Sequence, residues 1–294
     1  MEKAKVYFTK TITPESLIKI YDALGTQLKG KTAIKISTGE PGGHHFLQPA
    51  LIADLVHKLD GTIVECCTAY PGKRMNVKDH WKTIEDHGFK AIAPCDIMDE
   101  SGEMELPVEN GFQLKKNIVG EHLADYDSVL ILSHFKGHAM GGFGGALKNI
   151  SIGIASTHGK TNIHTAGVTT EASQLFNNLP EQDHFLESMA DACKAVIDYK
   201  GKDNMLYVSV ANNLSIDCDC DSNPHAPEME DIGIFASTDP VALDQACYDA
   251  VINSPDAGKA ALIERMNSLH GIHIVEAASE LGLGSREYEI VSMD

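Results

Sequence analysis

The chain has 294 residues, of which 43% are hydrophobic and 22% charged, so its composition is that of a globular protein and excludes a disordered chain. The formal net charge is −18, from 42 acidic and 24 basic residues. Such a surface repels phosphate backbones and anionic lipids, so we expect no nucleic acid and no membrane among its partners. Solubility alone also accounts for this charge.

The cysteines favour a reducing compartment. There are seven of them, an odd number, and no two are spaced as CxxC. The first residues are charged and strand-like, without the apolar core of a signal peptide, and no apolar run approaches the roughly 20 residues that span a bilayer. We therefore expect a cytoplasmic protein with free thiols, and no ferredoxin-type cluster, which needs cysteines at short, regular spacing.

Strand-like and helix-like segments alternate along the chain. The predicted strands cover residues 5–9, 32–37, 62–67, 90–94, 127–133, 205–210, 231–236 and 287–291, and the main helices 14–28, 47–59, 76–87, 180–199 and a segment that Asp239-Pro240 opens. This rhythm is typical of a mainly parallel sheet. We predict an α/β fold with two lobes, residues 1–130 and 131–294, each with helices flanking a mainly parallel sheet, and a cleft between the lobes.

A glycine-rich segment, residues 133–149 (SHFKGHAMGGFGGALKN), follows the apolar strand 127–133. It therefore lies at the carboxyl end of that strand, where α/β sheets gather ligands. Its glycines let the backbone approach a ligand closely, and a helix beginning within 144–148 would offer free N–H groups to an anion. A glycine-rich turn with surface histidines accounts for the same spacing.

Three side chains of this segment are candidate catalytic groups. Lys136 and Lys148 bring positive charge to an acidic protein, and Lys148 is predicted to bind an anionic group or to form a covalent adduct. His138 is predicted to give or take a proton. The predicted ligand-binding residues are Gly144, Gly145, Asn149 and Lys35.

Lys35 is a candidate for a different reason. It lies within the predicted strand 32–37, where a charge is costly unless it is paired. The polar turn 37–45 follows this strand and would reach the same edge of the sheet as the glycine-rich segment. A position on an edge strand would also explain the lysine.

Histidines and cysteines provide candidate metal ligands. Four of the 14 histidines fall between residues 134 and 164, and the segment 217–221 reads Asp-Cys-Asp-Cys-Asp. On an extended chain, Cys218 and Cys220 point to one side and the aspartates to the other. Imidazole and thiolate suit zinc, nickel or iron, so His164, Cys218 and Cys220 are the predicted metal ligands. A solvated acidic loop with two incidental thiols is the alternative.

Two motifs resemble the hallmarks of domain-of-unknown-function family 362. The first is Lys136-Gly137-His138 followed by Gly144-Gly145-Ala146-Leu147-Lys148-Asn149, and the second is Asp217-Cys218-Asp219-Cys220 followed by residues 231–246. Members of that family are often described as iron–sulfur or cytoplasmic proteins, and many carry a ferredoxin insert before the last core strands. Here the corresponding stretch, 198–206, is short and has no cysteine.

The chain is also distantly similar to the nickel-pincer lactate racemase family. In that family a lysine after a glycine-rich segment tethers the cofactor, and a later histidine binds nickel. The positions that match are His138, Lys148 and His164. This resemblance implies a ligand- or metal-binding cleft.

Three functions are compatible with these patterns. The first is a metal-dependent enzyme that acts on a small anionic substrate in the cleft. The second is a non-catalytic anion-binding or accessory module, in which the glycine-rich loop holds a carboxylate or phosphate. The third, which rests on family analogy, is an electron-transfer protein.

Overall fold

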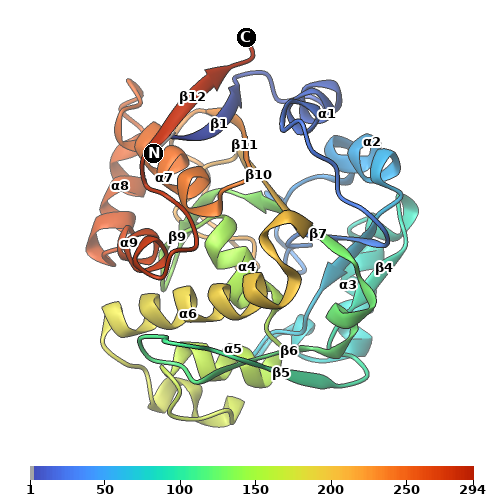
Figure 1. Cartoon of the computed structure of the whole chain (residues 1–294), viewed down its shortest axis with the longest axis vertical. Helices are drawn as coiled ribbons and strands as arrows, with labels where there is room; N and C mark the ends of the chain where they lie inside the picture. The colour runs from blue at the N-terminus through green and yellow to red at the C-terminus, as the bar shows by residue number, and fades with distance from the viewer. Residues whose placement is uncertain (1–2) are drawn as a thin grey trace.

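The computed structural model describes residues 3–294, and its centre is one eight-stranded sheet (Figure 1). In spatial order the strands are β12 (Tyr288–Ser292), β1 (Ala4–Thr9), β11 (Gly233–Ser237), β10 (Met205–Ala211), β7 (Ser128–His134), β2 (Thr32–Lys35), β3 (Thr62–Glu65) and β4 (Cys95–Ile97). β11 runs antiparallel to β1 and β10, and all other neighbours in the sheet pair in parallel. The predicted α/β fold with a mainly parallel sheet is confirmed.

Helices cover both faces of the sheet. On one face lie α1 (Pro14–Ala23), α2 (Pro49–Leu59) and α3 (Val77–Asp86); the core on the other face includes α4 (Ala146–Ile154), α5 (Thr157–His164), α6 (Gln182–Lys200), α7 (Pro240–Ile252), α8 (Lys259–Ser268) and α9 (His273–Glu280). β7 separates the two cores, because its successive side chains point to opposite faces. Val129 and Ile131 pack with α4, whereas Leu130 and Leu132 belong to the core of α1 and α2.

Smaller elements complete the fold. Two antiparallel hairpins pair β5 (Glu103–Pro107) with β6 (Lys116–Gly120) and β8 (Lys136–His138) with β9 (Gly142–Gly144). The short 3₁₀ turns are Lys73–Met75, Phe89–Ala91, Glu121–Asp125, Ala172–Asn177 and Lys202–Asn204. The predicted strand at 90–94 is wrong, because Gly88, with a φ of +85°, turns the chain into the 3₁₀ turn and the strand forms only at Cys95.

The eight-stranded sheet is continuous across the predicted lobe boundary. Residue 130 lies inside β7, whose neighbours are β2 from the first half of the chain and β10 from the second. Strands of both halves therefore share one sheet. The division into lobes 1–130 and 131–294 stays a prediction.

The order of the strands brings four loops together. β10, β7, β2 and β3 are adjacent and parallel, so the loops that follow them leave the sheet at one edge. After β2 the chain continues to α2 on one face, and after β7 it continues to α4 on the other face. The two loops therefore diverge between β2 and β7, which is the position at which open α/β sheets form a ligand crevice.

Candidate functional site

A cavity of about 660 Å³ opens at this edge of the sheet. Its walls come from the loops after β2, β3, β7 and β10 and from α4 and α5. Seven of the residues predicted from the sequence line it: Lys35, His138, Lys148, Asn149, His164, Cys218 and Cys220. The structure thus brings the histidine-rich and the cysteine-rich segments to one place.

The other three predicted residues lie beside this cavity. Lys136, Gly144 and Gly145 line a space of about 40 Å³, which Lys148 and Asn149 also border. Asn149 is buried there and donates hydrogen bonds from its amide to the Lys35 carbonyl oxygen, at 3.1 Å, and to the Ser133 hydroxyl, at 3.2 Å. It therefore ties α4 to β2 and β7.

A buried network of charges forms one wall of the cavity. Nζ of Lys35 lies 3.0 Å from Oε2 of Glu65, and Nη1 of Arg74 lies 3.2 Å from Oε1 of the same carboxylate. Nε of Arg74 lies 2.9 Å from Glu40. Burial alone would raise the pKa of Glu65, but Lys35 and Arg74 lower it well below its ordinary value. Lys35 is thus a paired lysine, and its pKa is lowered chiefly by burial.

The ion pairs of Glu65, Arg74 and Glu40 were not predicted from the sequence, although the turn 37–45, which contains Glu40, was expected at this edge of the sheet. Their signal was the buried lysine itself, because a charge in a central strand requires a partner. Glu65 is the last residue of β3, the strand adjacent to β2, and Lys35 ends β2. The pair therefore joins the carboxyl ends of two neighbouring strands.

Lys148 differs from the other cations of the cavity. It extends from the first turn of α4 into the cavity, and within residues 3–294 no carboxylate or carbonyl accepts a hydrogen bond from its Nζ. Burial and the neighbouring charges of Lys35 and Arg74 lower the pKa of Lys148 to about 8. Lys160, on α5, donates to the carbonyl oxygen of Ala155. Lys148 thus brings to the cavity a positive charge with which no carboxylate of residues 3–294 pairs directly.

The two histidines of the cavity hold their protons on different nitrogens. The N–H groups of Met140 and Gly141 donate to Nδ1 of His138, at 3.3 and 2.9 Å, so the ring hydrogen of neutral His138 is on Nε2. Nδ1 of His164 instead donates to the Lys160 carbonyl oxygen, at 2.7 Å, which leaves Nε2 as an acceptor. Burial lowers the pKa of His138 well below its ordinary value and that of His164 to about 4, so both rings are neutral at pH 7.

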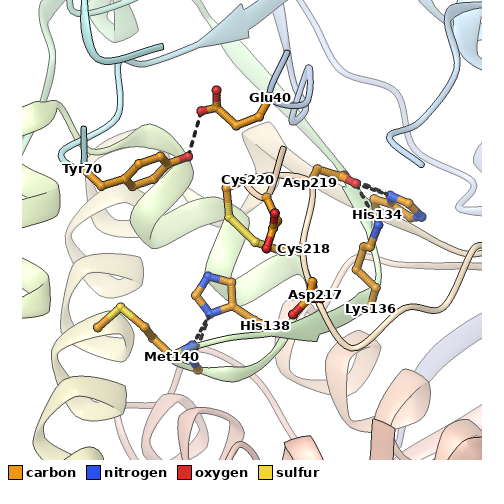
Figure 2. Close-up of a disulfide and its surroundings, with 12 residues drawn as sticks. Glu40, Tyr70, His134, Lys136, His138, Met140, Asp217, Cys218, Asp219 and Cys220 are labelled. Atoms are coloured by element: carbon orange, nitrogen blue, oxygen red, sulfur yellow. Dashed lines mark hydrogen bonds and ion pairs between the residues drawn. A yellow bond between two sulfur atoms is a disulfide. The ribbon is translucent and has the colours of Figure 1, made fainter. Parts of the chain in front are cut away.

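Buried pairs fix the loop that follows β10. Oδ1 of Asp219 lies 2.9 Å from Nζ of Lys136, and Oδ2 lies 2.9 Å from Nδ1 of His134 (Figure 2). Asp217 accepts a hydrogen bond from the backbone N–H of His225, and Nη1 of Arg265 lies 3.5 Å from it. Lys136 is thus held by Asp219; its predicted catalytic role stays a prediction.

Cys218 and Cys220 are bonded to each other as a disulfide. The prediction of free thiols is therefore wrong for this pair, whereas Cys66, Cys67, Cys95, Cys193 and Cys247 are free. The two sulfur atoms line the cavity, and Asp219 points the other way (Figure 2). A sequence cannot distinguish two thiolate ligands from a disulfide at this spacing.

The helix N-terminus predicted to bind an anion already has a partner. α4 begins at Ala146, and the N–H groups of Ala146 and Leu147 donate to the carboxylate of Asp244, at 2.7 and 2.8 Å. The prediction that these N–H groups are free is therefore wrong. Gly145 permits this contact, since a Cβ there would lie 2.4 Å from Oδ1 of Asp244. Asp244 belongs to the second sequence motif, so the cap joins the two motifs.

Within residues 3–294, three groups of side chains have donor atoms close enough together to hold a metal ion. They are His138 with Cys218 and Cys220; Asp183 with His270 and His273; and Asp96 with Glu100 and His122. The predicted ligand His164 is not in the first group. That group does not fit a metal ion as it stands, because a metal needs thiolates and an imidazole lone pair. Here the sulfurs are bonded to each other, and the hydrogen of His138 is on Nε2.

A family model described as "Domain of unknown function (DUF362)" matches residues 32–249. The chain belongs to this family, which confirms the resemblance seen in its two motifs. No curated protein sequence matches the chain. None of the helices formed by residues 3–294 has the combination of length and apolar character that a membrane span requires.

Two solved structures are similar to the chain at low identity. One is the lactate racemase apoprotein from Thermoanaerobacterium thermosaccharolyticum, with 15% identity and a TM-score of 0.45 over 84% of this chain and 57% of that one. The other is a protein from Thermotoga maritima, with 12% identity and a TM-score of 0.38 over 91% of this chain and 58% of that one. The chain thus spans less than two thirds of the length of either protein.

Proposed function

We propose that the chain is an enzyme that binds a small carboxylate or phosphate in the cavity, with Lys148 as the group that meets the anion. The observation that carries this proposal is that Nζ of Lys148 faces the cavity with no acceptor among the described residues. A partly desolvated ammonium without a counterion is costly. A bound anion would supply the missing partner, and Lys160 lies in the wall of the same cavity.

The two neutral histidines support a reaction rather than binding alone. His138 presents an N–H donor and His164 an acceptor nitrogen, so a ligand held by Lys148 would meet both kinds of group. A lysine whose pKa is about 8 is partly deprotonated near neutral pH and therefore nucleophilic. The same amine suits either electrostatic binding or an imine with a carbonyl substrate.

Calorimetry with malonate and with inorganic phosphate tests the binding. We expect saturable binding of at least one of them to the native chain and none to Lys148→Met. Lys82→Met is the matched control, because Lys82 is exposed and pairs with Asp86 on α3. Heats that are the same for all three proteins would refute the proposal.

Pyruvate and borohydride test the chemistry, because pyruvate combines a carboxylate with a carbonyl. An imine at Lys148 would be reduced to a stable adduct that peptide mapping locates. Binding without an adduct at Lys148 and without turnover would favour the alternative, a non-catalytic anion-binding or accessory module. An electron-transfer role by family analogy would require an iron–sulfur absorbance band in protein purified without oxygen.

In an alternative form of the proposal, the cavity holds a transition metal, which would be zinc, nickel or iron. It requires that Cys218 and Cys220 are reduced and that His138 frees a ring nitrogen. Metal analysis of untagged protein before and after reduction tests this. Less than about a tenth of an equivalent in both states would exclude a metal centre. A cytoplasmic location is likewise proposed, from the free thiols of Cys66, Cys67, Cys95, Cys193 and Cys247.

A further inference from the structure

The disulfide and His138 face each other in the cavity. Donor atoms of His138, Cys218 and Cys220 lie within 4.8 Å of one another. The ring turns Nδ1 toward the backbone of Met140 and its other side toward the sulfurs (Figure 2). Because Nδ1 accepts two backbone N–H groups, the nitrogen on that other side is Nε2, which carries hydrogen. The disulfide thus has a hydrogen-bond donor beside it.

A structural role explains this disulfide poorly. In the chain-entropy model, the stabilisation from a disulfide grows with the logarithm of the length of the loop that it closes, and this one joins residues only two apart. The loop is already anchored by the pairs of Asp219 with Lys136 and His134. In the cytoplasm, which is the location proposed above, disulfides are usually transient and catalytic or redox-sensing.

We propose that Cys218 and Cys220 form a redox-active pair that exchanges with a low-molecular-weight thiol bearing carboxylates, and that His138 donates a hydrogen bond to the thiolate that leaves. The anionic nature of the thiol rests on the proposed function of Lys148. The redox activity of the pair does not, because it depends only on the sulfurs and His138.

The exchange is balanced in two steps. The thiolate of a first small thiol attacks one sulfur of the pair, which forms a mixed disulfide, and the other cysteine leaves as a thiolate that takes up the proton of the first thiol. A second small thiol attacks the mixed disulfide at the small-molecule sulfur, and the second cysteine leaves with that proton. The protein disulfide is reduced to a dithiol, and two small thiols are oxidised to their disulfide.

The neighbouring aspartates oppose this chemistry less than the sequence indicates. Negative charge near a thiol disfavours the thiolate. However, Asp219 forms an ion pair with Lys136 and a hydrogen bond with His134, and Asp217 contacts Arg265 and His225. Lys148 borders the same small space as both cysteines and adds positive charge there.

Three thiols distinguish the parts of this proposal. Glutathione is anionic, cysteamine is cationic and dithiothreitol is neutral; each is added to the native oxidised protein at equal thiolate concentration. Peptide mapping after alkylation measures free Cys218 and Cys220. We expect all three thiols to reduce the pair. Glutathione should react about tenfold faster than cysteamine, because a charge-assisted contact between its carboxylates and Lys148 would stabilise the attacking complex. In Lys148→Met this preference should vanish while reduction by dithiothreitol persists.

Each failure has a separate meaning. If none of the thiols reduces the pair until the protein is denatured, the redox proposal is wrong, and the malonate and phosphate experiments still decide the proposed function. If dithiothreitol reduces the pair but glutathione has no advantage over cysteamine, the anionic thiol is wrong.

His138 is tested by two substitutions and a control. His138→Leu removes the N–H donor and should slow reduction by about tenfold, whereas His138→Gln keeps an amide donor and should retain most of the rate. His158→Leu is the control, since His158 is exposed and contacts Glu103. A His138→Leu protein that reacts as fast as the native chain would refute the role of His138. Cys220→Ser checks the pathway independently with oxidised glutathione, because the Cys218 thiolate should attack its disulfide, form a stable mixed disulfide and release one molecule of reduced glutathione.

Discussion

Lys136 and Asp219 form a buried ion pair, with 2.9 Å between Nζ and Oδ1, although 83 residues separate them in the chain. Lys136 belongs to the first sequence motif and Asp219 to the second. The pair therefore holds the cysteine loop against the strand that carries His138. Asp244 joins the same two motifs a second time, at the start of α4.

Removing one partner of this pair should destabilise the fold. Lys136→Met leaves the buried Asp219 with only the His134 ring as a side-chain partner, and breaking a buried pair costs about 3–5 kcal/mol. Urea denaturation measures the loss. Lys82→Met, which breaks an exposed pair with Asp86, should cost at most about 1 kcal/mol. Equal losses in the two variants would show that the buried pair has no special importance.

Binding of malonate should weaken above pH 8. The ammonium form of Lys148 attracts the anion, and burial with the charges of Lys35 and Arg74 lowers its pKa to about 8. As the pH rises beyond that value, the affinity should decrease by about tenfold per pH unit, because the neutral amine has no charge to offer. Malonate is chosen because it stays fully ionised over this range.

Lys148→Arg is the control for this pH dependence. The guanidinium remains charged well beyond pH 10, so any binding that the variant retains should not change between pH 8 and 9.5. Titration calorimetry at half-unit intervals gives both profiles. A native protein whose affinity is constant from pH 7 to 9.5 would contradict the low pKa of Lys148.

Asp244 should make the stability of the fold depend on pH. Burial raises its pKa to about 7, although the N–H groups of Leu147 and Ala146 oppose the shift. Between pH 4 and pH 7 the folded protein therefore keeps a proton that the unfolded chain has lost. The free energy of unfolding should decrease with rising pH in this window by up to about 1.4 kcal/mol per pH unit from this group.

The Asp244→Asn variant isolates this contribution. Asparagine cannot ionise, so the stability of the native protein minus that of the variant should fall by on the order of 4 kcal/mol from pH 4 to pH 7. Urea denaturation at four pH values gives the difference. The variant loses one acceptor for the α4 cap at every pH, so the slope is the test. A difference that rises with pH would mean that Asp244 is ionised in the folded state at pH 4.

The sequence predicted the sheet and the place of the site for the same reason. Central strands such as β7 are apolar on both faces, so they stand out as short runs, and the polar segments after them must lie at the carboxyl edge. That logic predicted that Lys35 and His138 lie at one edge of the sheet, and the structure shows that Cys218 lines the same cavity. The hairpin of β8 and β9 was missed, because strands of three residues with glycines have no periodic pattern.

Ion-pair and hydrogen-bond partners that are distant in the sequence could not be predicted. The buried Lys35 implied a counter-charge, but nothing local identifies Glu65 and Arg74 as its partners. The free N–H groups at the start of α4 implied an acceptor, and only the folded chain shows that the side chain of Asp244 provides it. The local sequence thus predicted that Lys35 and the first N–H groups of α4 need partners, and the tertiary structure determines which residues are those partners.

Two adjacent glycines of the first motif should differ sharply in their tolerance of a methyl group. A Cβ on Gly145 would lie 2.4 Å from Oδ1 of Asp244, whereas a Cβ on Gly144 would meet only Cδ of Lys148, at 3.8 Å. Asp244 is buried and bonded to two N–H groups, so it cannot move without loss of the α4 cap. Gly145→Ala should therefore cost about 1–3 kcal/mol of stability, and Gly144→Ala less than about 1 kcal/mol.

Urea denaturation compares the stabilities of the two variants. Calorimetry with malonate should show weaker binding only for Gly145→Ala, because Lys148 projects from the first turn of the displaced helix α4. Variants of equal stability and affinity would mean that the close contact between Gly145 and Asp244 does not position Lys148.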